Sequence, residues 1–228
     1  MFPRPVHAVV FDMDGLLVDS EIVFRDAMVH VAREHGRDLP MDVFLRMVGL
    51  PGPVSRLVAI EHFGADFPID SYHAAVWAHA RRLHQDSGVM LKPGVVELLD
   101  HLDAIALPKA VATSSSHDAV EMQLGHNKIM HRFQAIIAAG DYARGKPYPD
   151  PFLTAARHLG VDPSLCLALE DSHNGVRAAC AAGMMTIMVP DLLQATDEMR
   201  ERCIAIAPDL RYVCAALKSH PAIPASND

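Results

Sequence analysis

The sequence contains no long apolar segment. None of its stretches reaches the roughly 20 consecutive apolar residues that a transmembrane helix needs. The first residues also lack the extended apolar core of a secretory signal peptide. We therefore expect a cytoplasmic protein that has no membrane as a partner.

Clustered positive charge is absent as well. The chain has 20 Lys and Arg residues against 28 Asp and Glu residues, which gives a formal net charge of −8 at pH 7. The longest basic run is the pair Arg81-Arg82. Nucleic acids and anionic membrane surfaces bind clustered positive charge, so neither is expected as a partner.

Cysteines are few and show no CxxC spacing, and the 14 histidines form no metal-binding motif. The cysteines are Cys166, Cys180, Cys203 and Cys214. This pattern favours reduced thiols in a cytosolic protein over a disulfide framework or a zinc site. Most of the histidines are expected at the surface or in packing positions.

The length of 228 residues fits one domain, or a main domain with an insert. Half of the residues are apolar and 21% are charged, which is typical of a globular protein. Residues 6–11 form a short apolar run that predicts a buried parallel strand. Asp12 and Asp14 follow at the end of this run, and Gly15 allows the chain to turn sharply. Two carboxylates this close require either a neutralising cation or exposure to solvent as a helix-capping turn.

From Pro93 onward, predicted helices and strands alternate regularly. The expected strands are 109–113, 133–139, 165–169 and 185–189. The helices expected between them lie near 93–102, from 117, at 149–159 and at 174–182. Such alternation predicts an α/β fold, a doubly wound parallel sheet with helices on both faces. The tail from Ser219, with Pro221 and Pro224, is expected to be frayed.

Residues 20–90 show no strand pattern. Asp19 or Ser20 is placed to cap a first helix that runs to about His35, and Gly36 is placed to stop it. The rest of this segment is predicted to be an all-helical insert, with helix breaks at the Gly- and Pro-containing stretches 49–53 and 64–68. A stripe of apolar residues at helical spacing indicates packing rather than ligand binding. Its members are Val76, Trp77, Ala80 and Leu83.

Polar clusters follow the predicted strands at the same end of the sheet. They are Asp12 and Asp14, the run Thr113-Ser114-Ser115-Ser116, Lys146, and the pair Glu170-Asp171. Each cluster alone is explained as a helix cap or a solvated loop. A parallel sheet, however, brings its strand ends together. Acids for a cation, a lysine and hydroxyl donors are the groups that phosphoryl transfer requires.

These residues resemble the motifs of the haloacid dehalogenase-like phosphotransferase superfamily, over nearly the whole chain. The motifs are Asp12-Met13-Asp14-Gly15, Thr113, Lys146 and Glu170-Asp171, in the family's order and approximate spacing. Further similar stretches lie at 16–21, 92–94, 145–150, 174–176, 181–183 and 189–191. The sequence is similar to the subgroup of β-phosphoglucomutase and small sugar- or nucleotide-phosphate phosphatases. The resemblance implies a Rossmann-like core of residues 1–19 and 91–228, with residues 20–90 as a mobile helical cap.

The resemblance also implies catalytic roles. Asp12 would attack phosphorus in line and form an aspartyl-phosphate. Asp14 would protonate the leaving alkoxide and then act as base on the hydrolytic water. Thr113 and the Ser114 amide would hold phosphoryl oxygens, and Lys146 would balance their charge. Met13, between the two acids, is expected to face the core because strand neighbours alternate sides.

Mg²⁺ is the cofactor that the resemblance implies. Its ligands would be the Asp12 carboxylate, the Asp14 backbone carbonyl and Asp171, with Glu170 ligating or orienting the ion. The ion would bridge the nucleophile and a phosphoryl oxygen, which lets one anion attack another.

The core motifs leave hydrolysis and phosphoryl transfer to a second hydroxyl open. β-Phosphoglucomutase-like sequences have a cap histidine where this chain has Phe24, and a basic residue in the cap loop that corresponds to residues 48–56. Arg56 could serve only if it were shifted, so hydrolysis is favoured over a mutase. A non-catalytic phosphate-binding protein is disfavoured because the nucleophile and the metal acids are present. Dehalogenation is disfavoured because it needs neither Asp14 nor those acids.

The expected partner is a small phosphorylated metabolite, and the expected assembly is a monomer or a weak homodimer. His117 and His173 lie close enough to the motifs to contact substrate, but surface positions are the simpler interpretation. Phe24, Met28 and Met47 are placed to line an apolar substrate pocket under the cap, although packing between cap and core explains them equally.

Overall fold

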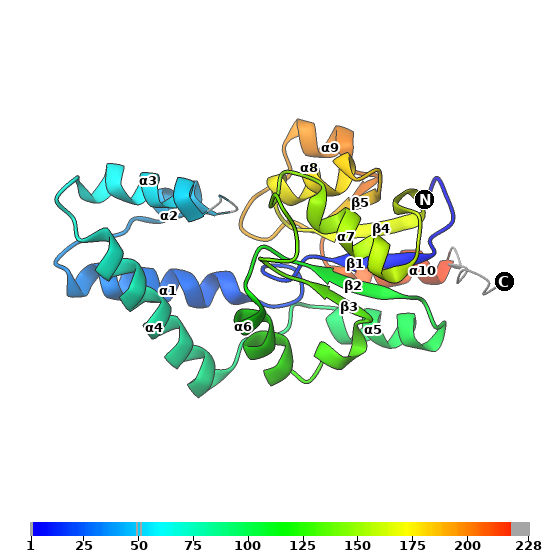
Figure 1. Ribbon diagram of the computed structural model, residues 1–228, viewed down its shortest axis with the longest axis horizontal. Coiled ribbons are helices and arrows are strands. Elements are labelled where there is room, and N and C mark those ends of the chain that lie inside the picture. The colour runs from blue at the N-terminus through cyan, green and yellow to red at the C-terminus, as the bar shows by residue number, and fades with distance from the viewer. Residues whose placement is uncertain (1, 49, 51, 220–228) are drawn as a thin grey trace.

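The computed structural model describes residues 2–48, 50 and 52–219, and its centre is a parallel six-stranded sheet (Figure 1). The spatial order is β3-β2-β1-β4-β5-β6. The strands are β1 (Ala8–Phe11), β2 (Lys109–Ala112), β3 (Ala135–Ile137), β4 (Cys166–Glu170), β5 (Met185–Met188) and β6 (Ala205–Ile206). The predicted α/β fold with a doubly wound, Rossmann-like sheet is confirmed.

Helices cover both faces of the sheet. The described helices and helical turns after the first strand are α1 (Ser20–Glu34), α2 (Met41–Met47), α3 (Gly52–Phe63), α4 (Ile69–Ser87), α5 (Val95–Ala104), α6 (His117–Val120), η1 (Glu121–Gly125), η2 (Met130–Arg132), α7 (Asp150–Leu159), η3 (Pro163–Leu165), α8 (His173–Ala181), α9 (Asp197–Arg202) and α10 (Leu210–Ser219). Side chains alternate across β1, so Val9 and Phe11 pack toward α5 and α10, whereas Ala8 and Val10 pack toward α7 and α8.

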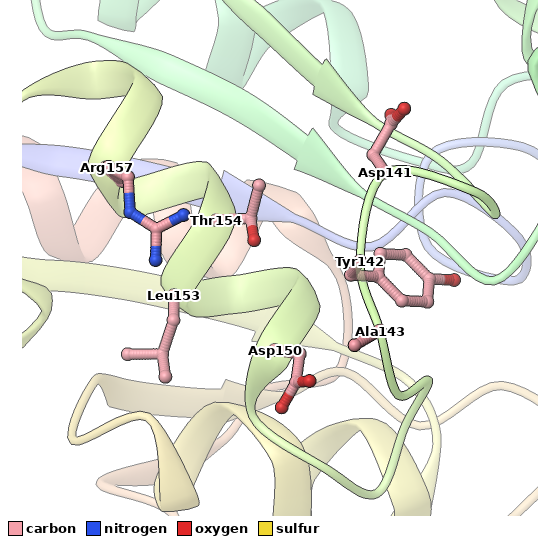
Figure 2. A pocket seen from close by; sticks show the side chains of 7 residues that line it. All are labelled: Asp141, Tyr142, Ala143, Asp150, Leu153, Thr154 and Arg157. Atoms are coloured by element: carbon pink, nitrogen blue, oxygen red, sulfur yellow. The ribbon is translucent and has the colours of Figure 1, made fainter.

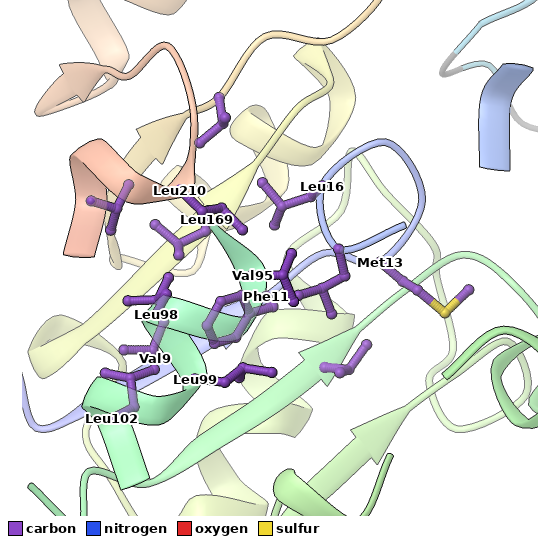
Figure 3. Packing of buried hydrophobic residues seen from close by; sticks show 14 of the residues in the cluster. Val9, Phe11, Met13, Leu16, Val95, Leu98, Leu99, Leu102, Leu169 and Leu210 are labelled. Carbon is purple, nitrogen blue, oxygen red and sulfur yellow. The ribbon is translucent and has the colours of Figure 1, made fainter. Parts of the chain in front are cut away.

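Figure 3 shows the larger of these two layers, where Leu98, Leu99 and Leu102 of α5 lie over Val9 and Phe11. These side chains are almost completely buried. Full burial of one such side chain stabilises the fold by about 1.5–3 kcal/mol. The core thus holds β1 rigidly, and with it the loop that leaves its carboxyl end. Met13 is fully buried in the same cluster, as expected.

The strand order reverses its direction between β1 and β4. From β1 the chain proceeds outward to β2 and β3, and then returns to β4 on the other side of β1. In open α/β sheets, ligands bind beyond the carboxyl ends of the strands at such a switch point. The loops after β1 and β4 are therefore the expected location of a site.

Helices α1–α4 lie together at one end of the molecule, beyond the sheet (Figure 1), and share a hydrophobic cluster of their own. Tyr72 is fully buried in it and donates a hydrogen bond from its hydroxyl to the backbone oxygen of Met28 at 3.0 Å. The two connections to the sheet run side by side. Asp19 N donates to Met90 O, and Lys92 N donates to Leu17 O.

Several element predictions need correction. Strand β3 covers 135–137 rather than 133–139, because its pairing with β2 is limited to the three residues Ala110–Ala112. The first helix begins at Ser20 without a side-chain cap from Asp19. β6, α9 and α10 were not predicted. Pro221 and Pro224 of the expected frayed tail lie outside the described residues.

Cys166, Cys180, Cys203 and Cys214 are free thiols, and Cys166 lies buried in β4. No helix in the described part of the chain is both long and apolar enough to cross a membrane.

Candidate active site

Three buried carboxylates meet where β1 and β4 end. Asp12 directly follows β1, and its backbone N–H donates to the Leu169 oxygen of β4 at 3.0 Å. Glu170 is the last residue of β4, and Asp171 comes next. One carboxylate oxygen from each of these three acids lies within 4.8 Å of the others. The parallel pairing of the two central strands therefore brings together the acids that the sequence places far apart.

Lys146 reaches this acid cluster from the loop before α7. Its Nζ donates to Asp12 Oδ1, and to Glu170 Oε1 at 2.5 Å. The side chain is only 7% exposed and passes over the ring of Phe152. Burial opposes its charge, but the attraction of Asp12 and Glu170 prevails and raises the pKa of Lys146. It therefore remains a cation and ties the β1 and β4 acids together.

One lysine does not neutralise three carboxylates. Burial raises the pKa of Asp12 to about 8, against the opposing attraction of Lys146 and with added repulsion from Glu170 and Asp14. Burial likewise raises the pKa of Asp171 well above its usual range, reinforced by repulsion from Asp12. Oxygen-only donors with excess negative charge fit a hard divalent cation, whose charge would favour the ionised carboxylates.

Two glycines make room for the acids. Gly15, in the loop after β1, has φ +78°, and a Cβ there would lie 2.4 Å from Asp171 Oδ2. A Cβ on Gly175, at the start of α8, would lie 1.8 Å from Glu170 Oε1. The Glu170 carboxylate also accepts hydrogen bonds from Ser172 N at 3.1 Å and Ser172 Oγ at 3.0 Å. Close backbone approach thus fixes the position of the Glu170 carboxylate.

Asp14 is held by hydroxyl groups. Its Oδ1 accepts a hydrogen bond from Ser20 Oγ at 2.6 Å, and its Oδ2 accepts from Ser115 Oγ at 2.7 Å and Thr113 Oγ1 at 3.4 Å. The role of Ser115 was missed because a run of four consecutive hydroxyl residues does not indicate which of them faces the acid. Of these four residues, Ser116 caps the following helix, with its Oγ accepting a hydrogen bond from Ala119 N.

A cavity of about 890 Å³ lies between these strand ends and helices α1–α4. On the sheet side its lining includes Asp12, Asp14, Thr113, Ser114, Lys146 and Asp171. On the helix side it includes Phe24, Met28 and Met47, the three residues considered as a pocket lining from the sequence. The structure thus brings all predicted site residues except the fully buried Glu170 to the wall of one cavity. His117 pairs with Asp141 and His173 contacts Gln194 O, and neither is among the residues that line it.

Glu21 also lines this cavity and was not singled out from the sequence. Burial raises its pKa to about 7, with added repulsion from Asp14, Asp191 and Asp19. The nearby Lys92 is already engaged, with Nζ 2.6 Å from Asp191 and 3.4 Å from Asp19. Glu21 therefore brings a readily protonated carboxyl group to the cavity beside Asp14.

A second cavity of about 280 Å³ lies beside α7 (Figure 2). Loop residues Asp141 and Tyr142 line it together with Asp150 and Arg157. Its two carboxylates are already occupied, since Asp141 pairs with His117 and Asp150 pairs with Arg144. It lacks the convergent acids of the larger cavity.

Comparison with known proteins agrees with this geometry. The family model of haloacid dehalogenase-like hydrolases matches residues 9–189. The chain belongs to this family. A Drosophila melanogaster protein named "Probable pseudouridine-5'-phosphatase" is 37% identical over 195 residues, covering 82% of this chain and 83% of that protein. The validoxylamine A 7'-phosphate phosphatase of Streptomyces hygroscopicus is 32% identical over 178 residues, covering 78% and 83% of the two chains.

Solved structures of the haloacid dehalogenase-like family have the same fold. CbbY from Rhodobacter sphaeroides, in complex with phosphate, superimposes with a TM-score of 0.76 at 27% identity, covering 90% of this chain and 95% of CbbY. The family is one of hydrolases, and several relatives carry phosphatase names. The chain is accordingly a phosphatase.

Proposed function

We propose that this protein is a Mg²⁺-dependent phosphomonoester hydrolase that acts on a small phosphorylated metabolite through an aspartyl-phosphate on Asp12. The observation that carries the proposal is the meeting of Asp12, Lys146, Glu170 and Asp171 at one end of the sheet, where all of them except the fully buried Glu170 line a cavity. Family members named for pseudouridine and validoxylamine phosphates support a small phosphorylated substrate.

Three groups on the cavity floor are suited to the phosphoryl oxygens. Lys146 supplies a buried ammonium group, Thr113 a hydroxyl, and the backbone N–H of Ser114 a further donor at the end of β2. Charge-assisted hydrogen bonds of this kind gain strength in a site that excludes water. These groups would orient the phosphoryl group so that its phosphorus faces the Asp12 carboxylate.

The donor set fits Mg²⁺. We assign the Asp12 carboxylate, the Asp14 backbone carbonyl and Asp171 as ligands, with Glu170 ligating or orienting the ion. When bound, the ion would supply positive charge that reduces repulsion between the Asp12 carboxylate and the substrate phosphate. The excess of buried carboxylates over Lys146 supports this assignment.

Asp12 and Asp14 carry the covalent steps. The Asp12 carboxylate attacks phosphorus, the bond from phosphorus to the substrate oxygen breaks, and Asp14 gives its proton to the departing alkoxide. Asp14 then removes a proton from water, which attacks the aspartyl-phosphate and releases inorganic phosphate with the Asp12 carboxylate restored. Ser20 and Ser115 keep the Asp14 carboxyl in position for both transfers.

We further propose that residues 20–90 act as a cap over a core made of residues 1–19 and 91–228. The separate hydrophobic cluster of α1–α4 and the pair of adjacent connections at Asp19–Met90 and Leu17–Lys92 support this division. Rotation at these connections would close the cavity over the substrate and exclude water. The cytoplasmic location and the monomer or weak homodimer expected from the sequence stay predictions.

A phosphomutase of the same core is the alternative. It requires a clamp for a second phosphate. Arg56, the basic residue expected nearest to that place, is engaged by Asp70, with Nη1 2.5 Å from Oδ1. Phe24 lines the cavity where a mutase-like chain has histidine. Gly49 and Pro51 of the intervening loop lie outside the described residues. These features favour hydrolysis.

Phosphate release from a panel of metabolite phosphomonoesters tests the proposal. We expect release that requires Mg²⁺, stops with EDTA, and is lost in Asp12→Asn. The panel includes β-glucose 1-phosphate, and glucose 6-phosphate is followed in the same reactions. Glucose 6-phosphate without free phosphate would establish the mutase. Ligand binding without any turnover would establish a non-catalytic phosphate-binding protein.

A further inference from the structure

The two walls of the active-site cavity differ in chemistry. The strand-end wall is polar, whereas the wall from α1, α2 and α4 is largely apolar and aromatic. One face of α4 lines the cavity at a spacing of three and four residues, which is a single helical stripe. Its members are Tyr72, His73, Val76, Trp77, Ala80, Arg81 and His84.

Trp77 departs from the packing role expected for this stripe. Val76 and Ala80 are buried in the α1–α4 cluster, as the periodicity predicts, but Trp77 is 51% exposed. Its ring packs edge-to-face on Phe24 of α1, with ring centroids 5.0 Å apart and an interplanar angle of 65°. Periodicity identifies the helix face but not whether that face meets another helix or a cavity. The ring of Trp77 is braced by Phe24 and left partly uncovered at the cavity.

The surroundings of Trp77 match a ring with apolar faces and polar edges. Met28 and Met47 add apolar surface to the same wall. His73 lies one turn before Trp77 on α4, and Arg81 lies one turn after it. Arg81 is exposed and lines the cavity. It is therefore available to the edge of a ligand that covers Trp77.

A pyranose ring fits this wall less well than a planar base. A pyranose ring carries hydroxyl groups around its whole edge. His73 and Arg81 offer polar partners on two sides of Trp77, but Met28 and Val76 offer none, and a buried hydroxyl without a partner is costly. Both faces of a nucleobase are apolar and stack on indole, and its polar atoms lie at the edge. A cavity of about 890 Å³ also has room beyond the phosphoryl group for such a leaving group.

We propose that Trp77 is a specificity-determining residue that stacks on a planar ring of the leaving group, and that the substrates are nucleoside 5'-monophosphates. This proposal rests on the proposed phosphatase activity of the same site. Hydrolysis would break the bond from phosphorus to the 5'-oxygen, with the proton for that oxygen coming from Asp14, and would release a nucleoside and inorganic phosphate.

Tryptophan fluorescence gives a direct binding test, because Trp77 is the single tryptophan of the chain. The Asp12→Asn variant with Mg²⁺ is titrated with uridine 5'-monophosphate and with ribose 5-phosphate, which has the same phosphate and sugar but no base. We expect saturable quenching by the nucleotide and little change with ribose 5-phosphate. Equal quenching by both, or quenching by glucose 6-phosphate alone, would overturn the stacking.

Kinetics of the wild-type chain and three variants complete the test. Trp77→Ala should lower kcat/KM for uridine 5'-monophosphate about tenfold, the order expected for one lost base stack, and change that for ribose 5-phosphate less than twofold. Trp77→Phe should retain most of the activity. Tyr212→Ala, which removes an aromatic ring that is 45% exposed on α10, is the matched control and should change neither value.

The two proposals fail in different ways. Absence of phosphate release from every ester would overturn the phosphatase function itself. Vigorous hydrolysis of hexose phosphates, unaffected by Trp77→Ala, would leave the phosphatase function standing and overturn the assignment of nucleoside monophosphates.

Discussion

Gly175 leaves no space for a side chain beside Glu170, so Gly175→Ala should damage both the fold and the site. The new Cβ would lie 1.8 Å from Glu170 Oε1 and 2.1 Å from Oε2. The obstacle is a fully buried carboxylate held by Lys146 at 2.5 Å and by two groups of Ser172. The carboxylate must therefore leave its position or α8 must move.

The size of the effect follows from the bonds that are lost. A hydrogen bond to a charged group contributes about 1.5–3 kcal/mol to stability. Removing one partner from a buried ion pair destabilises the fold by about 3–5 kcal/mol. We expect Gly175→Ala to lower the free energy of unfolding by about 3–5 kcal/mol. Because Glu170 also belongs to the acid cluster, Mg²⁺ affinity should fall about 10–100-fold.

Urea unfolding, followed by far-ultraviolet circular dichroism, measures the stability, and calorimetric titration with Mg²⁺ measures the affinity. Gly125→Ala is the matched control, because its Cβ would meet Glu121 Cγ at an ordinary 3.9 Å. That variant should match the wild type within about 1 kcal/mol. A Gly175→Ala protein with wild-type stability and Mg²⁺ affinity would refute the packing argument for Glu170.

Three further predictions concern titratable groups. Asp12, with a pKa of about 8 before the cation binds, should lose its proton on Mg²⁺ binding at pH 7, so the apparent binding enthalpy should vary with the ionisation enthalpy of the buffer; an enthalpy independent of buffer would contradict this. Glu21, with a folded pKa of about 7, stabilises the fold below its unfolded pKa of 4.5 and loses that contribution as pH rises through 7. The stability of Glu21→Gln relative to the wild type, measured by urea unfolding, should therefore be about 2–3 kcal/mol higher at pH 8 than at pH 4.5. An equal difference in stability between the two proteins at both pH values would exclude the shift. His84 is buried with both ring nitrogens unpaired among the described residues, and burial lowers its pKa. The unfolded chain thus binds the proton more readily, so His84→Leu should be at least as stable as wild type at pH 7 and gain further as the pH falls below 6.5; a loss of stability at both pH values would show that His84 has a partner.

The sequence predicted the acid cluster because parallel strands end at a common edge. Asp12 and Asp171 lie far apart in the chain, yet alternation of helices and strands is enough to expect them together. The helical pattern of residues 20–90 was equally visible, because apolar residues recur there at helical spacing and no strand pattern is present.

Other features depend on distances that a sequence pattern does not contain. The choice of Ser115 rather than its neighbours for Asp14 depends on how the chain leaves β2. The burial of Glu21 depends on where α1 meets the sheet. Strand β6 has two residues, too few for a periodic signal. Helix α10 was also missed, although Leu210, Val213 and Leu217 recur in it at helical spacing.

Direct detection of the phosphorylated enzyme is the sharpest test of the proposed mechanism. Protein quenched in acid during turnover with Mg²⁺ is digested, and the peptide that contains Asp12 is examined by mass spectrometry. We predict a peptide with the added mass of one phosphoryl group on Asp12, absent without Mg²⁺ and absent in Asp12→Asn. Steady phosphate release without that species, together with an active Asp12→Asn variant, would contradict the proposed role of Asp12.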